Sequence, residues 1–314
     1  MVKTSLNPLK FKDAKLTITG DERAFVPFET LKTLWFNTGT LCNLACENCY
    51  IESSPTNDAL VYLTADDVRG YLDELGAAYK DTKEIGFTGG EPFVNPHMMN
   101  ILTTTLERGF SALVLTNAMR PMLRASVAKP LLELKKRYGN RLTMRVSLDH
   151  YTSILHEKER GIGTWQPTVK GMDWLSSNGF ELHVAGRTCW GESMDDARDG
   201  YNDLFKRHDW DVDAYNPSTL VLFPEMEMET DLPEISTGCW QILGKKSADM
   251  MCATSRMVVK RRGEDLPTVV ACTLLPYSPD FDYGPELSDA TKNVSLNHPH
   301  CARFCVLGGA SCSV

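Results

Sequence analysis

The stretch LKTLWFNTGTLCNLACENCYIESS, residues 31–54, decides the fold of this 314-residue chain. It opens with a short apolar run (31–36) that has the length and composition of a buried strand. Three cysteines follow, Cys42, Cys46 and Cys49, separated by three and then two residues. Three thiolates in so short a loop can hold three corners of an iron–sulfur cube and leave the fourth iron without a protein ligand. An iron with an open position can bind an external molecule, whereas a fully ligated cluster only passes electrons.

Composition sets the class of protein. Hydrophobic residues make up 42% and charged residues 24% of the chain, as in soluble globular proteins. No apolar run is long enough to cross a bilayer, and the first residues lack the pattern of a secretory signal, so we expect a cytoplasmic protein without membrane contact. The net charge of −8 makes a nucleic-acid partner unlikely. Ten cysteines in such a chain favour metal or redox use over disulfides.

The middle of the chain alternates short apolar runs with amphipathic segments. We predict strands at 31–36, 84–90, 111–117, 143–149, 181–187 and 218–223. We predict helices from Thr64, with Asp67 in a capping box, and at about 97–108, 126–138, 168–177 and 194–207. Strands that alternate with helices indicate right-handed βαβ units and a parallel sheet. Six units predict an α/β fold built as a partial (β/α)6 TIM-like barrel rather than a full eightfold one.

The alternation stops after Glu225, and the rest of the chain is rich in Pro, Gly and Cys. We therefore predict three parts: an N-terminal extension (1–30), the partial barrel (31–225) and a small cysteine-rich C-terminal domain (226–314). In the last part a hairpin is expected at 255–272. Cys189 stands alone between the two groups of cysteines and is interpreted as a core residue.

Gly89, Gly90, Glu91 and Pro92 form a second motif at the end of the second predicted strand. Alone, this sequence is a turn signal. One βα unit after the three cysteines it has another use, because glycines let backbone carbonyls approach a ligand closely. Those carbonyls and the Glu91 carboxylate can accept hydrogen bonds from an ammonium group. A structural zinc site is the alternative for the cysteines, but zinc requires a fourth ligand and the nearest histidine, His97, is distant in sequence.

The chain resembles enzymes of the radical S-adenosylmethionine (SAM) superfamily over roughly residues 31–225. The resemblance lies in CNLACENCY (42–50), GFTGGEP (86–92), LVLTN (113–117), SLDH (147–150) and LHEKERGIGTWQPTVKGMDWL (155–175). The last segment is similar to that of members with a SPASM or Twitch C-terminal extension. The resemblance implies a [4Fe–4S] cluster on Cys42, Cys46 and Cys49, with SAM bound to the open iron.

The resemblance also implies a set of SAM-binding residues. Gly89, Gly90 and Glu91 would meet the methionine amine, and Asn117 and Ser147 would lie near the methionine or ribose. Tyr50 would lie near the adenine, and Asp149 and Arg160 are further possible contacts. For a strand-end polar residue, a capping or loop role is the alternative.

The last quarter of the chain carries Cys239, Cys252, Cys272, Cys301, Cys305 and Cys312. The resemblance to SPASM and Twitch extensions implies an auxiliary [4Fe–4S] cluster here, for which we expect Cys252, Cys272, Cys305 and Cys312, with Cys301 as the main competitor. The interval from Gly263 to Cys272 is longer than in the usual pattern, and six thiols do not suffice for two fully ligated clusters. A zinc knuckle that includes His298 or His300, or core thiols, are the alternatives.

Two classes of function follow. The first is a radical SAM oxidoreductase that abstracts hydrogen from a small molecule or a peptide, including a maturase of a ribosomal peptide, with electrons from a flavodoxin- or ferredoxin-type donor. The second is a non-catalytic Fe–S or zinc binding or assembly protein. A carrier protein has no need of an amine-binding turn, so Gly89–Glu91 favours the enzyme. The sequence names neither the substrate nor the oligomeric state.

Overall fold

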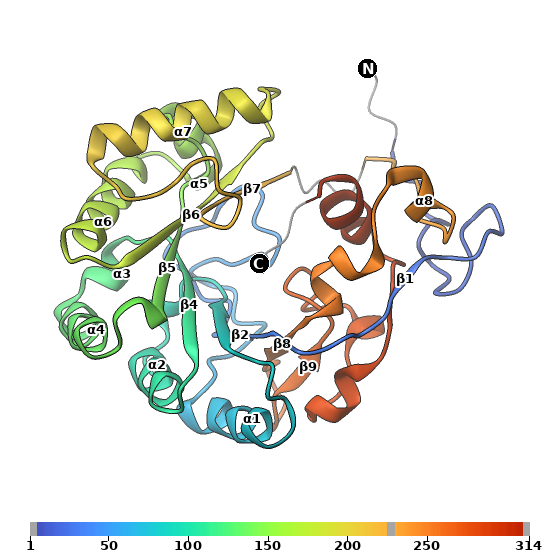
Figure 1. The fold of residues 1–314 in the computed structure, drawn as a ribbon, viewed down its shortest axis with the longest axis horizontal. Helices are drawn as coiled ribbons and strands as arrows, with labels where there is room; N and C mark the ends of the chain where they lie inside the picture. The colour runs from blue at the N-terminus through green and yellow to red at the C-terminus, as the bar shows by residue number, and fades with distance from the viewer. Residues whose placement is uncertain (1–4, 225–229, 310–314) are drawn as a thin grey trace.

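The computed structural model describes residues 5–224 and 230–309, and its centre is a curved sheet with helices on the outer side (Figure 1). Six consecutive parallel strands make up most of the sheet: β2 (Thr33–Asn37), β3 (Glu84–Thr88), β4 (Ser111–Thr116), β5 (Leu142–Ser147), β6 (Glu181–Arg187) and β7 (Leu220–Phe223). All five residues of β2 are buried, as expected for a strand covered on both faces. The six predicted strands are therefore confirmed, and each predicted boundary lies within two residues of the observed one.

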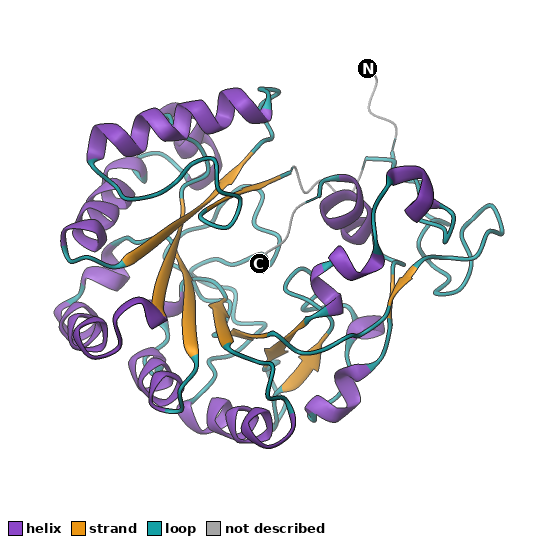
Figure 2. Ribbon diagram, in the orientation of Figure 1, coloured by secondary structure: helices purple, strands orange, loops and turns teal. Residues whose placement is uncertain are grey.

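Helices connect these strands and cover one face of the sheet (Figure 2). They are α1 (Ala65–Ala78), α2 (Met98–Glu107), α3 (Arg120–Leu123), α4 (Ala125–Tyr138), α5 (Ser153–Arg160), α6 (Trp165–Ser177) and α7 (Met194–His208). The predicted capping box is present, because the Thr64 hydroxyl accepts a bond from the Asp67 amide (3.1 Å) and the Asp67 carboxylate accepts one from the Thr64 amide (2.8 Å). α3 and α5 were not anticipated as separate helices. α3 has only four residues, and α5 has eight, the last four of them charged, so neither has an apolar period long enough to reveal it.

The C-terminal hairpin joins the same sheet. β8 (Ser255–Val259) pairs antiparallel with β9 (Thr268–Val270), which confirms the predicted hairpin. β8 also lies parallel to β2, with Thr33 opposite Ser255 and Phe36 opposite Val258. The sheet order is therefore β7-β6-β5-β4-β3-β2-β8-β9. In the described part of the chain its ends, β7 and β9, do not pair with each other, so the barrel is open, as the α/β partial-barrel prediction required.

The first 30 residues pack against the C-terminal part. β1 (Phe25–Val26) pairs antiparallel with β10 (Val294–Ser295), and the two form a separate small sheet. Arg23 and Glu234 form a buried ion pair, and the Glu234 carboxylate also accepts bonds from two amides of the N-terminal segment. The predicted N-terminal extension and C-terminal segment thus share one core. That core also contains α8 (Cys239–Leu243) at its edge and a π-helical segment (Cys301–Leu307), in which the Gly308 amide donates to the Arg303 carbonyl at 2.8 Å.

Candidate radical SAM site

A cavity lies at the carboxyl ends of the parallel strands, where folds of this type gather their ligands. Almost every predicted site residue of the barrel lines it: Cys42, Cys46, Cys49, Tyr50, Gly89, Gly90, Asn117, Ser147, Asp149 and Arg160. Residues from the C-terminal half of the chain, including Leu274 and Phe304, complete the wall. The structure thus brings together residues that are up to 262 positions apart in sequence, from Cys42 to Phe304.

The three cysteines of the loop after β2 are half-buried, and none of the described cysteines forms a disulfide. Burial raises the pKa of the Cys42 thiol to about 12 and also raises that of Cys46, so a thiolate here needs a cation to compensate it. Backbone amides already point at two of the sulfurs, from Leu44 to Cys42 Sγ (3.4 Å) and from Ser53 to Cys49 Sγ (3.3 Å). Amide donors to sulfur stabilise the negative charge of cluster ligands. The loop therefore fits an iron–sulfur cluster.

A buried ion pair at the wall of the same cavity holds this loop. The Glu159 carboxylate, at the end of α5, accepts from the Asn48 amide (3.1 Å) and from its side-chain Nδ2 (2.9 Å). Arg187, at the end of β6, donates to the same carboxylate, and both side chains are nearly inaccessible to solvent. The sequence reasoning missed Glu159 and Arg187, although Glu159 lies beside Arg160 in the quoted segment. A charged residue in a helical pattern is ordinarily exposed to solvent, so no sequence pattern marked Glu159 as buried.

Asp149 and Arg160 form a second ion pair at the cavity wall. Burial opposes the charge of Arg160, but Asp149 and the nearby thiols Cys46 and Cys42 outweigh it and raise the Arg160 pKa. The guanidinium therefore remains charged beside the cysteine loop. A fixed positive charge at this position favours thiolates and any anionic group bound in the cavity.

Gly89 and Gly90 are required first by the packing of two chain segments. A Cβ on Gly90 would lie 2.3 Å from the Leu41 carbonyl oxygen, and one on Gly89 would lie 2.6 Å from the Gly39 carbonyl oxygen. The Gly90 amide donates to the Gly39 carbonyl at 2.8 Å. The glycine turn thus fixes the start of the cysteine loop, and both glycines also line the cavity, where their backbone can meet a ligand.

Glu91 occupies a different place from the other predicted ligands. It is 2% exposed and does not line the cavity. One carboxylate oxygen accepts from Thr116 Oγ1 (2.8 Å) and the Phe93 amide (3.2 Å), and the other accepts from the Asn117 amide (2.8 Å). Burial outweighs these bonds and raises the Glu91 pKa to about 7. In this structure Glu91 holds the end of β4 and, with it, Asn117. The Asn117 side chain in turn donates a hydrogen bond from Nδ2 to Asn43 Oδ1 at 3.0 Å.

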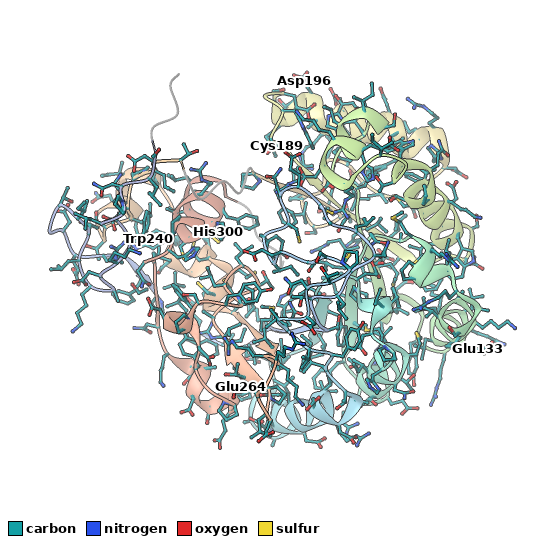
Figure 3. The ribbon with its side chains drawn as sticks, turned by 180° about the vertical axis from the view of Figure 1, so that it is seen from behind. Glu133, Cys189, Asp196, Trp240, Glu264 and His300 are labelled. Carbon is teal, nitrogen blue, oxygen red and sulfur yellow. The ribbon has the colours of Figure 1, made fainter. Side chains whose placement is uncertain are left out.

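Four of the C-terminal cysteines line a second, apolar cavity. They are Cys252, Cys272, Cys301 and Cys305, and His300 lines the same cavity. Burial raises the pKa of Cys252 to about 11 and raises that of Cys301 well above its ordinary value, so these thiols too need cations to ionise. Leu274 lines this cavity and the first one, so the two are neighbours. Figure 3 places His300 in the C-terminal part, far from Glu133 on α4.

The role expected for one of these ligands, Cys312, stays a prediction. Cys301, which was the competitor in the sequence analysis, belongs to the cysteine group, whereas Cys312 lies outside the described residues. Among the described residues, no group of three or more His, Cys, Asp or Glu is gathered as the ligands of a metal ion. The thiolates of an iron–sulfur cube each bind a different iron and stand further apart than the ligands of one ion. Four thiols around one cavity fit such a cube.

Comparison with known proteins agrees with this geometry. The family model of the radical SAM superfamily matches residues 36–202, more than half of the chain. The antilisterial bacteriocin subtilosin biosynthesis protein AlbA of Bacillus subtilis (strain 168) is 35% identical over 145 residues. That match covers 46% of this chain but only 30% of the length of AlbA.

Two solved structures share the fold. The structure of anSMEcpe with bound AdoMet has a TM-score of 0.59 and 15% identity, and the match covers 83% of this chain and 77% of that one. The structure of Streptococcus suis SuiB bound to S-adenosylmethionine has a TM-score of 0.57 and 14% identity, and covers 81% of this chain and 63% of that one. The likeness thus extends past the barrel into the cysteine-rich part.

The fold and the cavity define an α/β partial-barrel enzyme built around an open cysteine loop. The chain belongs to the radical SAM superfamily, whose cofactors are a [4Fe–4S] cluster and SAM. In the described ranges no helix has the length and apolar character that a membrane span requires.

Proposed function

We propose that this chain is a radical SAM maturase that modifies a peptide by hydrogen abstraction, with SAM and a [4Fe–4S] cluster in the first cavity and an auxiliary [4Fe–4S] cluster in the second. The observation that carries the proposal is the first cavity, which collects Cys42, Cys46 and Cys49 with the glycine turn at the carboxyl ends of the strands. The peptide substrate is supported by the relative AlbA, a bacteriocin biosynthesis protein.

The residues of the cavity divide the work of binding. Cys42, Cys46 and Cys49 would hold three irons, and the backbone of Gly89 and Gly90 would accept bonds from the methionine amine. Asn117, Ser147 and Tyr50 would contact the rest of SAM, since each lines the same cavity. Glu91 would act by positioning Asn117 and the glycine turn, because its oxygens already accept three protein bonds.

A cluster held by Cys42, Cys46 and Cys49 together with bound SAM would supply one-electron reductive cleavage of SAM and so the abstraction of a hydrogen atom from the substrate. The chain itself orients the reactants and excludes water. Phe223, Phe304 and Leu274 form an apolar part of the cavity wall, and the rings of Phe223 and Phe304 lie 5.2 Å apart. An apolar wall that excludes water protects a reactive radical from side reactions.

In this proposal the second cavity decides whether the net reaction is an oxidation or is redox-neutral. It adjoins the first through Leu274 and offers four thiols, which suffices for one fully ligated cluster. A cluster there would accept an electron from the substrate radical and make the net reaction an oxidation. Without it, a redox-neutral reaction such as an epimerisation would follow.

The test is 5′-deoxyadenosine production by anaerobic, reconstituted protein with dithionite and SAM. We expect the product to form, and its formation to rise when the cognate peptide is added. Isotopic hydrogen transferred from a labelled peptide to 5′-deoxyadenosine would identify the substrate class. A protein that retains full iron but forms no 5′-deoxyadenosine under any condition would instead be a binding or assembly protein, and transfer from a small metabolite alone would replace the peptide.

A further inference from the structure

An open basic groove lies beside the cysteine loop, between α3 and the start of α6. The lining residues are Arg120, Leu123, Arg124, Gln166, Pro167 and Lys170. They include three cations and no carboxylate. The chain as a whole carries a net charge of −8, so this positive surface stands out from its surroundings.

The three cations are available to a partner. Arg120 and Lys170 are exposed, and no salt bridge to either is found within the described ranges. The Arg124 guanidinium donates to the carbonyls of Pro121 (3.1 Å) and Phe93, so its position is fixed while its charge is not neutralised. Such uncompensated charge attracts an acidic partner and speeds its association.

Direct contacts connect the groove with the cysteine loop. Met119, which precedes α3, accepts a bond through its sulfur from Asn43 Nδ2 (3.9 Å), and Asn43 follows Cys42 directly. Asn117 Nδ2 in turn donates to Asn43 Oδ1 (3.0 Å). The groove therefore flanks the loop on the side of α3.

α6 also approaches this region closely. A Cβ on Gly171 would lie 1.7 Å from the Ala118 carbonyl oxygen, so glycine is needed for the helix to reach the turn after β4. Lys170 precedes Gly171 directly, so the close packing of α6 at Gly171 places Lys170 at the groove. Figure 1 shows α3 between α4 and α6 on the outer side of the sheet.

An exposed apolar side chain lies close in sequence to the groove. Ile162 is 97% exposed and lies between Gly161 and Gly163, four residues before Gln166 of the groove. It also follows Arg160 of the cavity wall by two positions. A partner protein seated on the groove and this loop would bury the Ile162 side chain and so add an apolar contact to the charged ones.

We propose that the groove and Ile162 form the docking surface for an acidic one-electron carrier protein of the flavodoxin or ferredoxin type. The inference rests on the proposed function, which requires one electron from outside for each SAM cleaved. In docking, the reduced carrier loses one electron and the cluster held by Cys42, Cys46 and Cys49 gains it, with no atoms transferred. The basic surface draws the acidic carrier to the flank of the cysteine loop, and the net negative charge of the chain disfavours docking elsewhere.

The first experiment measures binding, not turnover. Isothermal titration calorimetry compares reconstituted wild-type protein, Arg120→Glu/Lys170→Glu and the matched control Lys12→Glu/Lys15→Glu, with a recombinant bacterial flavodoxin as titrant. The control reverses the same number of exposed charges on the N-terminal segment, which lies on the opposite side of the molecule (Figure 1). We expect the groove variant to weaken binding by at least about tenfold at low salt and the control by less than about threefold.

Two further measurements locate the contact. Raising the salt concentration should weaken wild-type binding steeply but leave binding by the groove variant unchanged or tighten it, because its reversed charges repel an acidic carrier and salt screens that repulsion. Ile162→Ser should weaken binding at every salt concentration, since an apolar contact is not screened. A zero-length carbodiimide cross-linker should join a flavodoxin carboxylate to the Lys170 amine, and mass spectrometry identifies the linked peptide.

Dithionite-driven cleavage separates this inference from the proposed function. We expect all variants to form 5′-deoxyadenosine at the wild-type rate with dithionite, and the groove variant to slow only with flavodoxin. If wild-type protein forms no 5′-deoxyadenosine with dithionite, the proposed function is wrong. Equal flavodoxin affinity of the groove variant and the control overturns the docking surface, and so does a groove variant that binds flavodoxin normally but loses affinity for an acidic substrate peptide.

Discussion

The two cysteine groups of this chain are built in opposite ways. Cys42, Cys46 and Cys49 come from one loop, are half-buried, and line a cavity that has both polar and apolar walls. The C-terminal cysteines come from several separate segments, and Cys252 and Cys301 are each 8% exposed around an apolar cavity. A loop of three ligands leaves a metal open to a small molecule, whereas ligands that converge from several segments close it off and tie those segments together. In the proposed function, this difference gives the chemistry to the first group and electron storage and stability to the second.

The strongest test of this division removes the first group. Changing Cys42, Cys46 and Cys49 to Ala should abolish 5′-deoxyadenosine formation, because no SAM-binding iron remains. Iron should fall from about eight to about four atoms per chain, as one of two four-iron cubes is lost. Iron analysis and Mössbauer spectroscopy measure this. Any 5′-deoxyadenosine from the triple variant, or loss of all iron, would remove the distinction between the groups.

The second test addresses the ligands of the C-terminal group. Cys301→Ala should lose about four irons and lower the stability of the protein, because ligation supplies folding energy to this part. Cys312→Ala should keep its iron if Cys301 is the ligand, and Cys189→Ala serves as a control. The reverse pattern would restore the ligand set expected from the sequence, and one bound zinc in place of the lost iron would indicate a structural knuckle.

The third test concerns the Glu159–Arg187 ion pair, which holds the cysteine loop through Asn48. Glu159→Ala leaves Arg187 buried without its partner and should cost about 3–5 kcal/mol of unfolding free energy. Asp66→Ala, which removes the exposed partner of Arg69, should change stability by less than about 1 kcal/mol. Urea denaturation followed by circular dichroism compares them. Equal small losses for both variants would mean that the loop does not depend on this pair.

The smallest effect is expected for the titration of Glu91. Its folded pKa, about 7, lies above the ordinary value of 4.5, so the protonated form is the one that folding favours. Its contribution to stability is therefore complete below about pH 4.5 and is lost as the pH rises to about 7. Glu91→Gln cannot ionise, so its stability should fall less than that of wild type between pH 5.5 and about 7.5. Urea denaturation without SAM at several pH values measures this, and parallel curves would contradict the assignment.

The sequence predicted what local pattern determines. The strands, the capping box at Thr64 and the convergence of the cysteine loop, Asn117 and Asp149 at one edge of the sheet follow from period, spacing and parallel topology. The contacts of Glu91 did not follow, because a motif shows which residues cluster but not which atoms face the ligand. Nor did the Glu159–Arg187 pair, since only the fold buries two charges that are 28 positions apart.

The position of the C-terminal hairpin was also hidden from the sequence. Its residues predict two strands but contain nothing that selects β2 as a neighbour. Cys301 was expected only as a competitor ligand, because spacing alone does not show which thiols share a cavity, and the structure places Cys301 in the second cavity. Long-range pairing depends on packing across the whole chain, and single-residue patterns carry little of that information.

The pairing of β2 with β8 has a consequence for how the protein is made. β2 begins at Thr33, but its partner Ser255 leaves the ribosome 222 residues later, at roughly 5–20 residues per second. Until then one edge of β2 has no hydrogen-bonding partner and resembles the exposed edges on which chains aggregate. β3 to β6 pair between near neighbours and can assemble first. β2, the first strand of the barrel, is therefore among the last to gain both of its neighbours. A chain that ends before residue 255 leaves one edge of β2 unpaired and prone to aggregate.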